Sequence, residues 1–115
     1  MKREARAAMV RIALGTQGQA CILRLSGSID AGNSATLRDA LFRLTEARTP
    51  SIVLDMSRLD SLDSAGIATL LEGLARTWYY GGDFQLEEVP RRIRSVIEIF
   101  QLQSLLLAEH PEARQ

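Results

Sequence analysis

The fold is decided by residues 51–74, which read SIVLDMSRLDSLDSAGIATLLEGL. An apolar run, Ile52 to Leu54, ends on an aspartate, as expected of a central strand covered on both faces. A short polar segment follows, and the tetrapeptide that starts at Asp63 leads into an amphipathic pattern. This order predicts a strand, a loop and a helix with Ser64 at its N-cap. A serine there is either a structural cap or a surface hydroxyl that a kinase can phosphorylate.

Length and composition indicate one ordinary globular domain. The chain has 115 residues, of which 46% are hydrophobic and 24% are charged. This is enough for one core and too little for two domains. With 14 basic and 14 acidic residues the net charge is zero, which argues against direct binding to nucleic acid. We expect a single domain over residues 1–115, with a core of about 9–107 and short flexible termini.

Cysteine and histidine are too scarce for a disulfide or a zinc site. Cys21 is the only cysteine and lies in an apolar run that predicts a buried strand, while His110 is the only histidine. One of each makes neither a disulfide nor a zinc site, and we expect no cofactor. No apolar run approaches the roughly 18 residues that cross a bilayer. The first residues lead into no signal-peptide core, so we expect a cytoplasmic protein without membrane insertion.

The residues before the central stretch predict a hairpin and a helix. Residues 9–14 and 19–25 alternate loosely on either side of a Gly-Thr-Gln-Gly turn, as paired antiparallel strands do. Asn33 is placed to cap the helix with its side-chain oxygen. The apolar residues of that helix recur at spacings of three and four: Leu37, Ala40, Leu41 and Leu44.

The residues after Ser64 predict two further helices and two short strands. The first helix has its core residues at Ile67, Leu70, Leu71, Leu74 and Trp78. Residues 84–86 and 105–107 are predicted as strands, and Pro90 suits the first turn of the last helix. That helix has its buried positions at Ile93, Val96, Ile97 and Phe100. The order β-β-α-β-α-β-α-β predicts an α/β fold with a mostly parallel sheet and an antiparallel N-terminal edge hairpin.

Motifs of familiar catalytic sites are absent from the chain. There is no dinucleotide-binding or phosphate-binding glycine loop, and a serine–histidine–aspartate triad would have to use the histidine in the tail. Asp55, Asp60 and Asp63 follow the strand and are candidate Mg²⁺ ligands. No lysine or second catalytic group lies near them, and near a helix start such carboxylates also complement the helix dipole. We expect no enzymatic activity and no metal.

Two surface clusters leave alternatives open. Arg91, Arg92 and Arg94 form either a solvated helix face or a docking surface for an acidic partner. The triplet at residues 78–80 holds the only tryptophan and both tyrosines, one of which we expect to point outward. Aromatic residues are favoured in interface cores, so a contact surface is one interpretation of the triplet. Packing at the end of the helix is the interpretation that we favour.

Three segments, in their order, resemble the STAS domain family, and within it the small single-domain anti-sigma factor antagonists of bacteria. Leu54-Asp55-Met56-Ser57, followed by Leu62-Asp63-Ser64-Ala65-Gly66, is similar to the family's strand ending in Asp-x-Ser, then D-S-x-G and an apolar helix. Gly27-Ser28-Ile29-Asp30 resembles its G-x-apolar-D element. Residues 81–93 resemble its glycine turn, strand and proline-started helix. The resemblance covers roughly residues 9–107.

The resemblance implies a partner-switching role controlled by phosphorylation. In that family a partner that is both serine kinase and anti-sigma factor phosphorylates the motif serine, which here is Ser64. The unphosphorylated domain binds the kinase and frees the sigma factor, and a phosphatase resets the phosphorylated form. Asp30 and Asp63 match acidic positions near the phosphorylation site. The expected partner surface also includes Ala65, Gly66 and Ser57.

The STAS family includes a second possible role for this chain, and the sequence differs from the family pattern at one helix end. The family also includes STAS subunits of lipid-transporting ABC systems, which dock on the ATPase subunit and often carry threonine at the switch site. Ser64 favours the first role, and in either role we expect a monomer or a weak dimer. Gln101 stands where the family commonly has glycine at a helix end. It must adopt a left-handed conformation or end the helix differently.

Overall fold

Four strands form one mixed sheet in the order β1-β2-β3-β4. The computed structural model describes residues 9–107. In chain order its elements are β1 (Val10–Gln17), β2 (Ala20–Ile29), α2 (Ser34–Glu46), β3 (Ser51–Leu62), α3 (Ser64–Tyr79), β4 (Asp83–Glu87), α4 (Arg91–Ile99) and α5 (Gln103–Leu106). β1 and β2 pair antiparallel, whereas β2 with β3 and β3 with β4 are parallel. The predicted α/β fold with an antiparallel edge hairpin is confirmed.

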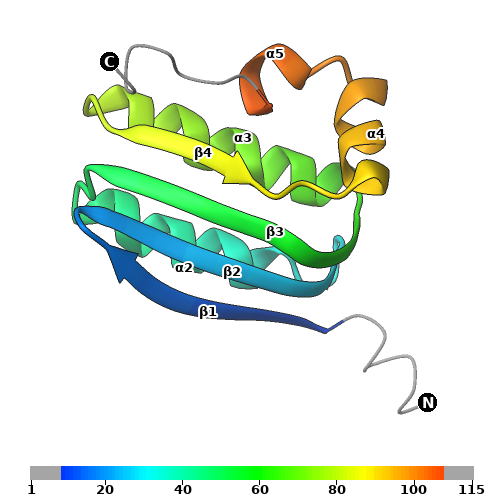
Figure 1. Ribbon diagram of the computed structural model, residues 1–115, viewed down its shortest axis with the longest axis horizontal. Coiled ribbons are helices and arrows are strands. Elements are labelled where there is room, and N and C mark those ends of the chain that lie inside the picture. Colours follow the sequence, from blue (N-terminus) through cyan, green and yellow to red (C-terminus); the bar gives the residue numbers. More distant parts are fainter. Residues whose placement is uncertain (1–8, 108–115) are drawn as a thin grey trace.

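The helices cover one face of the sheet and leave the other open. In Figure 1, α2 and α3 lie side by side behind the sheet, and α4 and α5 lie above β4. No described helix lies in front of the sheet in this view. Because β2, β3 and β4 run in the same direction, their C-terminal ends meet at one end of the sheet, and α2, α3 and α4 begin there.

The strand β3 is much longer than the sequence predicts. A loop is expected after Leu54, but the strand continues through that segment to Leu62. The pairing of β3 with β2 shifts register between Arg24 and Ser26, and again farther along. A bulge adds residues to one strand and changes which face the next side chains reach. The shifts return Leu59 and Leu62 to the core but break the alternation by which a strand is recognised.

The core lies between the sheet and the helices and is almost entirely aliphatic. Its largest fully buried side chains include Leu23, Leu25, Ile29, Leu37, Ile52, Leu54, Met56, Leu59, Leu70, Ile93 and Ile97. Burying each such side chain contributes about 1.5–3 kcal/mol. Cys21 is half-buried against this cluster, and burial raises the pKa of its thiol. None of the helices within residues 9–107 has the length and apolar character needed to cross a membrane.

Two aromatic residues that the sequence predicts for the core lie at the surface. Trp78 is 47% exposed near the end of α3, and Phe100 is 45% exposed where α4 ends. The last buried aliphatic residues of these two helices are Leu74 and Ile97. Thr77, directly before Trp78, is fully buried, so α3 still packs against the core there and Trp78 lies on its outer side. Phe100 is the C-cap of α4, after the last buried turn of that helix.

The last predicted strand, at residues 105–107, is wrong, because Leu105 and Leu106 belong to the short helix α5 and Leu107 is its C-cap. Gln101 has a φ of 59°, so it adopts the left-handed conformation expected at this helix end. The Leu102 N–H then donates to the Ile97 carbonyl, as in a Schellman motif, and the chain turns into α5. Leu106 is buried and anchors that helix. A run of three leucines has no periodicity that distinguishes a short helix from a strand.

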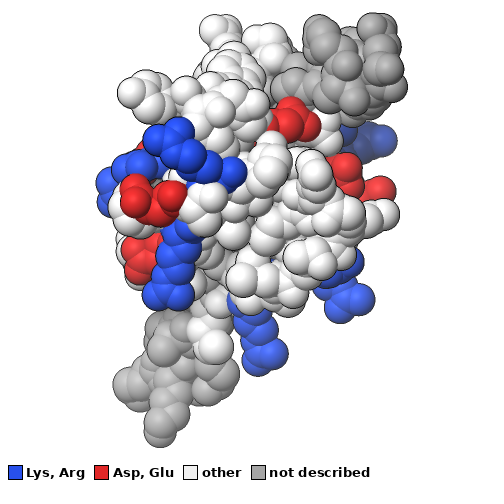
Figure 2. All heavy atoms as spheres, turned by 90° about the vertical axis from the view of Figure 1, so that its left-hand side faces the viewer, with Lys and Arg blue, Asp and Glu red and all other residues white. Residues whose placement is uncertain are grey.

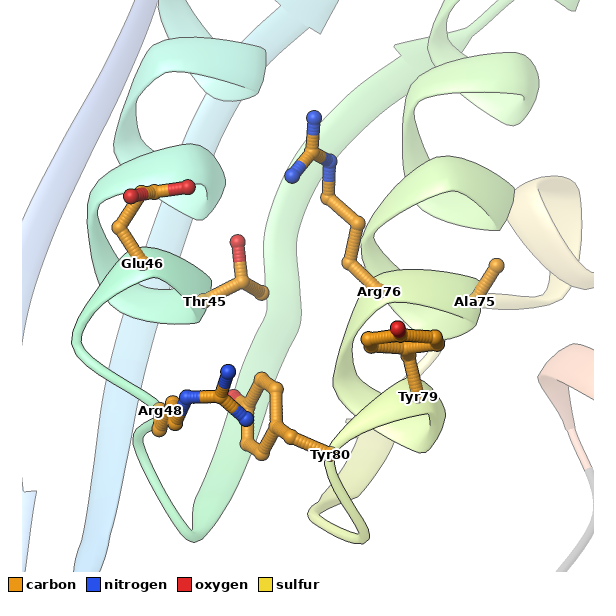
Figure 3. A pocket seen from close by; sticks show the side chains of 7 residues that line it. All are labelled: Thr45, Glu46, Arg48, Ala75, Arg76, Tyr79 and Tyr80. Carbon is orange, nitrogen blue, oxygen red and sulfur yellow. The ribbon is translucent and has the colours of Figure 1, made fainter.

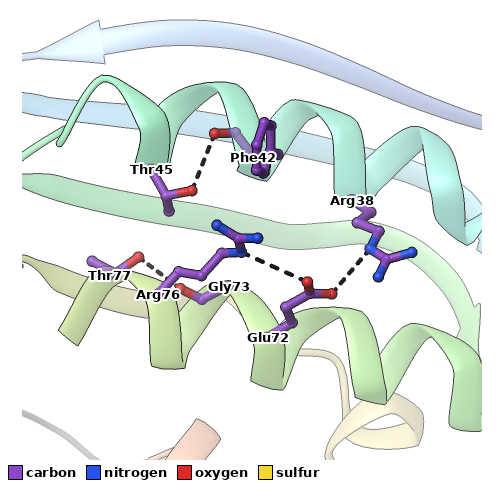
Figure 4. A network of polar contacts seen from close by, with 7 residues as sticks. All are labelled: Arg38, Phe42, Thr45, Glu72, Gly73, Arg76 and Thr77. Carbon is purple, nitrogen blue, oxygen red and sulfur yellow. Dashed lines mark hydrogen bonds and ion pairs between the residues drawn. The ribbon is translucent and has the colours of Figure 1, made fainter. Parts of the chain in front are cut away.

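A polar network joins the outer surfaces of α2 and α3 (Figure 4). Arg38 Nε lies 3.1 Å from Glu72, and Arg76 Nε lies 3.6 Å from the same carboxylate. The Arg76 guanidinium also lies over the Phe42 ring, 4.7 Å from its centroid. Beneath the network, a Cβ on Gly73 would come within 2.9 Å of a leucine of α2. The missing side chain therefore allows the two helices to approach closely.

Candidate functional site

The starts of α2 and α3 lie together at the C-terminal end of the sheet. The Asp63 N–H donates to the Ile29 carbonyl at 3.2 Å, which ties the residue before α3 to the end of β2. Asp30 directly follows Ile29. The structure therefore brings Asp30 and Asp63, the two acidic residues predicted for the site, onto neighbouring strand ends beside Ser64.

The N-cap of α3 is Asp63, so the prediction that Ser64 is the cap is wrong. Asp63 Oδ1 accepts hydrogen bonds from the N–H groups of Ala65 at 3.0 Å and Gly66 at 3.2 Å. Aspartate and serine are equally good N-caps, so residue type does not distinguish two adjacent candidates. An ionised carboxylate here also interacts favourably with the N-terminal end of the helix dipole.

Ser64 is the first residue of α3, and its side chain is exposed. Among residues 9–107 its hydroxyl has no hydrogen-bond partner. Because Asp63 satisfies the free amides of the first turn, the helix does not need this hydroxyl. The Ser64 hydroxyl is therefore free to react at the surface without loss of the cap.

Gly66 determines how closely the start of α3 approaches the sheet. It is buried, and a Cβ at this position would overlap the Leu62 side chain and lie 2.9 Å from Ile29 Cγ2. Ala65 is half-buried. These two residues of the predicted partner surface donate the amides that Asp63 binds, so they hold Ser64 in a defined position.

Asp30 and Asn33 organise the turn before α2. Asp30 Oδ1 accepts the Gly32 N–H at 2.8 Å. Asn33 occupies the N-cap position, but its side chain makes no cap hydrogen bond to the helix. Instead, its Oδ1 accepts the Asp30 N–H at 2.9 Å, and its Nδ2 donates to the Ser28 carbonyl at 2.9 Å. The predicted Asn33 cap is therefore wrong, and sequence reasoning missed its bracing role, for which an Asp-x-x-Asn turn pattern is the local signal.

Ser57 does not belong to the Ser64 surface. It lies within β3, about 16 Å before Leu62 at the usual rise of a strand. Its N–H donates to Asp55 Oδ1 at 3.0 Å. Hydrogen bonding from Ser57, helped by two nearby arginines, lowers the pKa of the Asp55 carboxyl. The Asp-x-Ser element therefore forms a local contact on the strand.

The three aspartates considered as Mg²⁺ ligands do not converge. Within residues 9–107, no group of three or more histidine, cysteine, aspartate or glutamate side chains is arranged to hold a metal. Asp60 pairs instead with Arg92, whose Nε donates to the Asp60 carbonyl at 2.7 Å and whose Nη2 lies 3.7 Å from Asp60 Oδ1. This contact, which the sequence does not indicate, joins the start of α4 to β3. Arg91 and Arg94 are exposed beside it.

The aromatic triplet lies at the opposite ends of α2 and α3. Tyr79 is 88% exposed, which confirms that one tyrosine points outward. The Tyr80 hydroxyl donates to the Thr49 carbonyl at 2.8 Å, and the Arg48 guanidinium lies 5.9 Å from the Tyr80 ring centroid. A cavity of about 470 Å³ lies between these helix ends (Figure 3), and both arginines that line it, Arg48 and Arg76, extend into the gap. Basic and acidic side chains are interspersed on this end of the molecule (Figure 2).

A family model described as "Mlab, STAS domain" matches residues 12–108. The match spans most of the chain and includes both helix starts. This chain belongs to the STAS domain family. The resemblance of its three segments to STAS proteins is therefore confirmed at the level of the family.

Solved structures of other proteins share this fold. An anti-sigma factor antagonist from Mycobacterium paratuberculosis matches at a TM-score of 0.75 with 18% identity, over 85% of this chain and 83% of its own. The unphosphorylated anti-sigma factor antagonist SpoIIAA matches at 0.70 with 20% identity, over 90% and 93%. A third protein, Mglu, is 30% identical at a TM-score of 0.61, over 70% of this chain but only 20% of its own. At these identities the first two likenesses establish the fold alone.

Proposed function

We propose that this protein is a STAS regulator that binds a partner protein through the surface around the start of α3. Phosphorylation of Ser64 ends that binding. One observation carries the proposal: Ser64 is exposed with a free hydroxyl because the neighbouring Asp63 caps the helix. The protein acts by binding and not by catalysis.

Electrostatics explain how a phosphate can switch binding without unfolding the domain. Phosphorylation adds a charge of about −1.5 to −2 at neutral pH. The amide end of α3 tolerates that charge, so the fold persists. A partner seated over Ser64 meets this charge beside the carboxylates of Asp30 and Asp63. A penalty of about 3 kcal/mol weakens binding more than a hundredfold.

The proposed partner is an anti-sigma factor that is also a serine kinase, and a phosphatase resets the switch in the cytoplasm. Two solved forms of the Bacillus protein SpoIIAA support this choice. The unphosphorylated form matches this chain at a TM-score of 0.70 and the phosphorylated form at 0.67, both with 20% identity. The fold of this chain is thus similar to both states of a protein that carries phosphate in one of them.

A second candidate function is docking on the ATPase subunit of a lipid-transporting ABC system. The observation in its favour is that the matching family model is described as a Mlab STAS domain and not as an anti-sigma factor antagonist. The genes beside this one distinguish the two candidates. A sigma factor and a serine kinase gene favour the first, and transporter genes favour the second.

The test is phosphorylation by the serine kinase encoded beside this gene. The purified protein is incubated with that kinase and ATP, and the modified residue is located by mass spectrometry. We expect phosphate on Ser64, its loss in Ser64→Ala, and its retention in Ser34→Ala, the matched change at the start of α2. Phosphate elsewhere on the chain, or none, would refute the switch.

A further inference from the structure

The open face of the sheet carries a polar site that is separate from Ser64. A cavity of about 580 Å³ lies across β1, β2 and β3. Each of these strands contributes one arginine to its lining: Arg11, Arg24 and Arg58. The lining also includes two serines and one carboxylate: Ser26, Ser57 and Asp55. Three guanidinium groups therefore gather around one described carboxylate, in a protein whose net charge is zero.

These positive charges are poorly neutralised within residues 9–107. Arg24 Nε lies 3.8 Å from Asp55 Oδ2, a long contact in which the arginine side chain is 57% exposed, and such pairs contribute little. No ion pair joins Arg11 or Arg58 to another described residue. Glu87, the register neighbour of Asp55 on β4, is the next carboxylate on this face.

The site is concave and its shape is set by the backbone. A Cβ on Gly15 would come within 3.0 Å of Arg24 Nη1, so the Arg24 side chain lies over β1 where glycine leaves room for it. A second hollow of about 300 Å³ continues the cavity and shares Arg11 and Ser26 with it. Together the two hollows form a groove across the strands. A groove of this kind accepts the side chains of an extended peptide that runs beside the strands.

We propose that this groove binds an acidic segment of a partner protein. Guanidinium groups present planar pairs of donors that match carboxylates. The groove adjoins β1, which is the edge strand of the described sheet, and edge strands are common docking sites for extended segments. Because the lining of the groove includes none of Asp30, Asp63 and Ser64, the segment binds whether or not Ser64 is phosphorylated.

An NMR titration of the ¹⁵N-labelled protein tests the location of the site. The probe is a short synthetic peptide of alternating glutamate and alanine, and the same peptide with glutamine is its uncharged control. We expect the amide signals of Arg11, Arg24 and Ser57 to move with the acidic peptide and not with the control. Shifts confined to other elements, or equal shifts with both peptides, would overturn the proposal.

Matched substitutions test whether the arginines act together or only through net charge. We expect R11Q/R24Q/R58Q to raise the dissociation constant of the acidic peptide by about tenfold or more. R38Q/R43Q/R48Q, which removes three exposed arginines of α2 and the turn after it, should change binding by less than about twofold. Asp55→Asn should strengthen binding because it removes a competing carboxylate. Equal losses in both triple variants would overturn the proposal.

Two further measurements separate peptide binding from a folding defect and from binding of other anions. R11Q/R58Q leaves the Arg24–Asp55 contact in place and guards against a folding defect in the triple variant. This double variant should still weaken binding of the acidic peptide severalfold. Two other anionic probes, phosphatidylglycerol vesicles and inorganic phosphate, are each titrated against the protein in separate experiments. Binding to vesicles without binding to the peptide would replace the proposal with a membrane site, and binding to phosphate alone would replace it with a small-anion site.

Discussion

The two helix starts, Asn33-Ser34 and Asp63-Ser64, look alike in sequence and differ in structure. Each follows a parallel strand, and each places a serine at the first residue of a helix. At α3 the N-cap side chain bonds to the amides of the helix, whereas at α2 it turns back and braces the preceding loop. Ser64 is exposed and Ser34 is half-buried. A serine at a helix start becomes a candidate switch when its neighbour does the capping and its hydroxyl faces solvent.

The largest expected effect comes from filling the space beneath Ser64. Gly66→Ala should lower the free energy of unfolding by about 1–3 kcal/mol, because the new methyl group overlaps Leu62 and Ile29 in a packed core. Urea denaturation measures the change. Gly32→Ala, in the loop before α2, is the matched control. The new Cβ at residue 32 would lie 3.3 Å from a carboxylate oxygen of Asp30 that can shift. Gly32→Ala should therefore lower the free energy of unfolding clearly less than Gly66→Ala.

Removing the α3 cap should have the next largest effect. Asp63→Ala should cost about 1 kcal/mol, because two amides of the first turn lose their partner. Asp63→Asn should recover most of that loss, since an amide oxygen can accept the same hydrogen bonds. Thermal unfolding of the two variants and of Ser64→Ala separates the roles. If Ser64→Ala destabilised the protein as much as Asp63→Ala, Ser64 would be part of the cap. The contrast drawn between the two helix starts would then be wrong.

Acid sensitivity should arise at Asp55 on the open sheet face, away from both helix starts. Hydrogen bonding from Ser57 holds the pKa of Asp55 below its ordinary value of 3.8. A depressed pKa in the folded state stabilises the protein above pH 3.8, and this contribution is lost as the pH falls through the folded value. Urea unfolding between pH 6 and pH 2.5 measures this loss. Asp55→Asn should show a shallower decline than the natural protein, and an identical decline would show that Asp55 is not responsible.

The smallest effects on stability should come from placing charge at the two serines. Ser64→Asp and Ser34→Asp should each change the free energy of unfolding by no more than about 0.5 kcal/mol, because an acidic residue suits the first turn of a helix. The two variants should differ in partner binding, which Ser64→Asp weakens and Ser34→Asp retains. Calorimetry with the purified partner measures this difference. If the two variants lost affinity equally, the charge would act through the whole protein and not at one surface.

The sequence predicts the element order from β1 to α4 and the sheet pairing, because helical and strand periodicities are strong in the core, as at Leu70 and Leu74. It does not predict α5, because a run of leucines fits a strand as well as a short helix. It also predicts that Asp30, Asp63 and Ser64 lie together, through the family resemblance. The length of β3 could not be predicted, since the register shifts opposite Arg24/Ser26 and Gly27/Ser28 break its alternation. The role of Asn33 could not be predicted either, because the same amide can serve the helix or the loop, and the surrounding backbone decides which.

The most direct test measures the affinity of the purified kinase partner for this protein with and without phosphate on Ser64. The phosphorylated protein is prepared enzymatically, its site is confirmed by mass spectrometry, and its fold is compared by circular dichroism. The account predicts an unchanged fold and a dissociation constant that rises by about a hundredfold or more, equivalent to roughly 3 kcal/mol. Equal affinity for the two forms, with phosphate confirmed on Ser64, would contradict it.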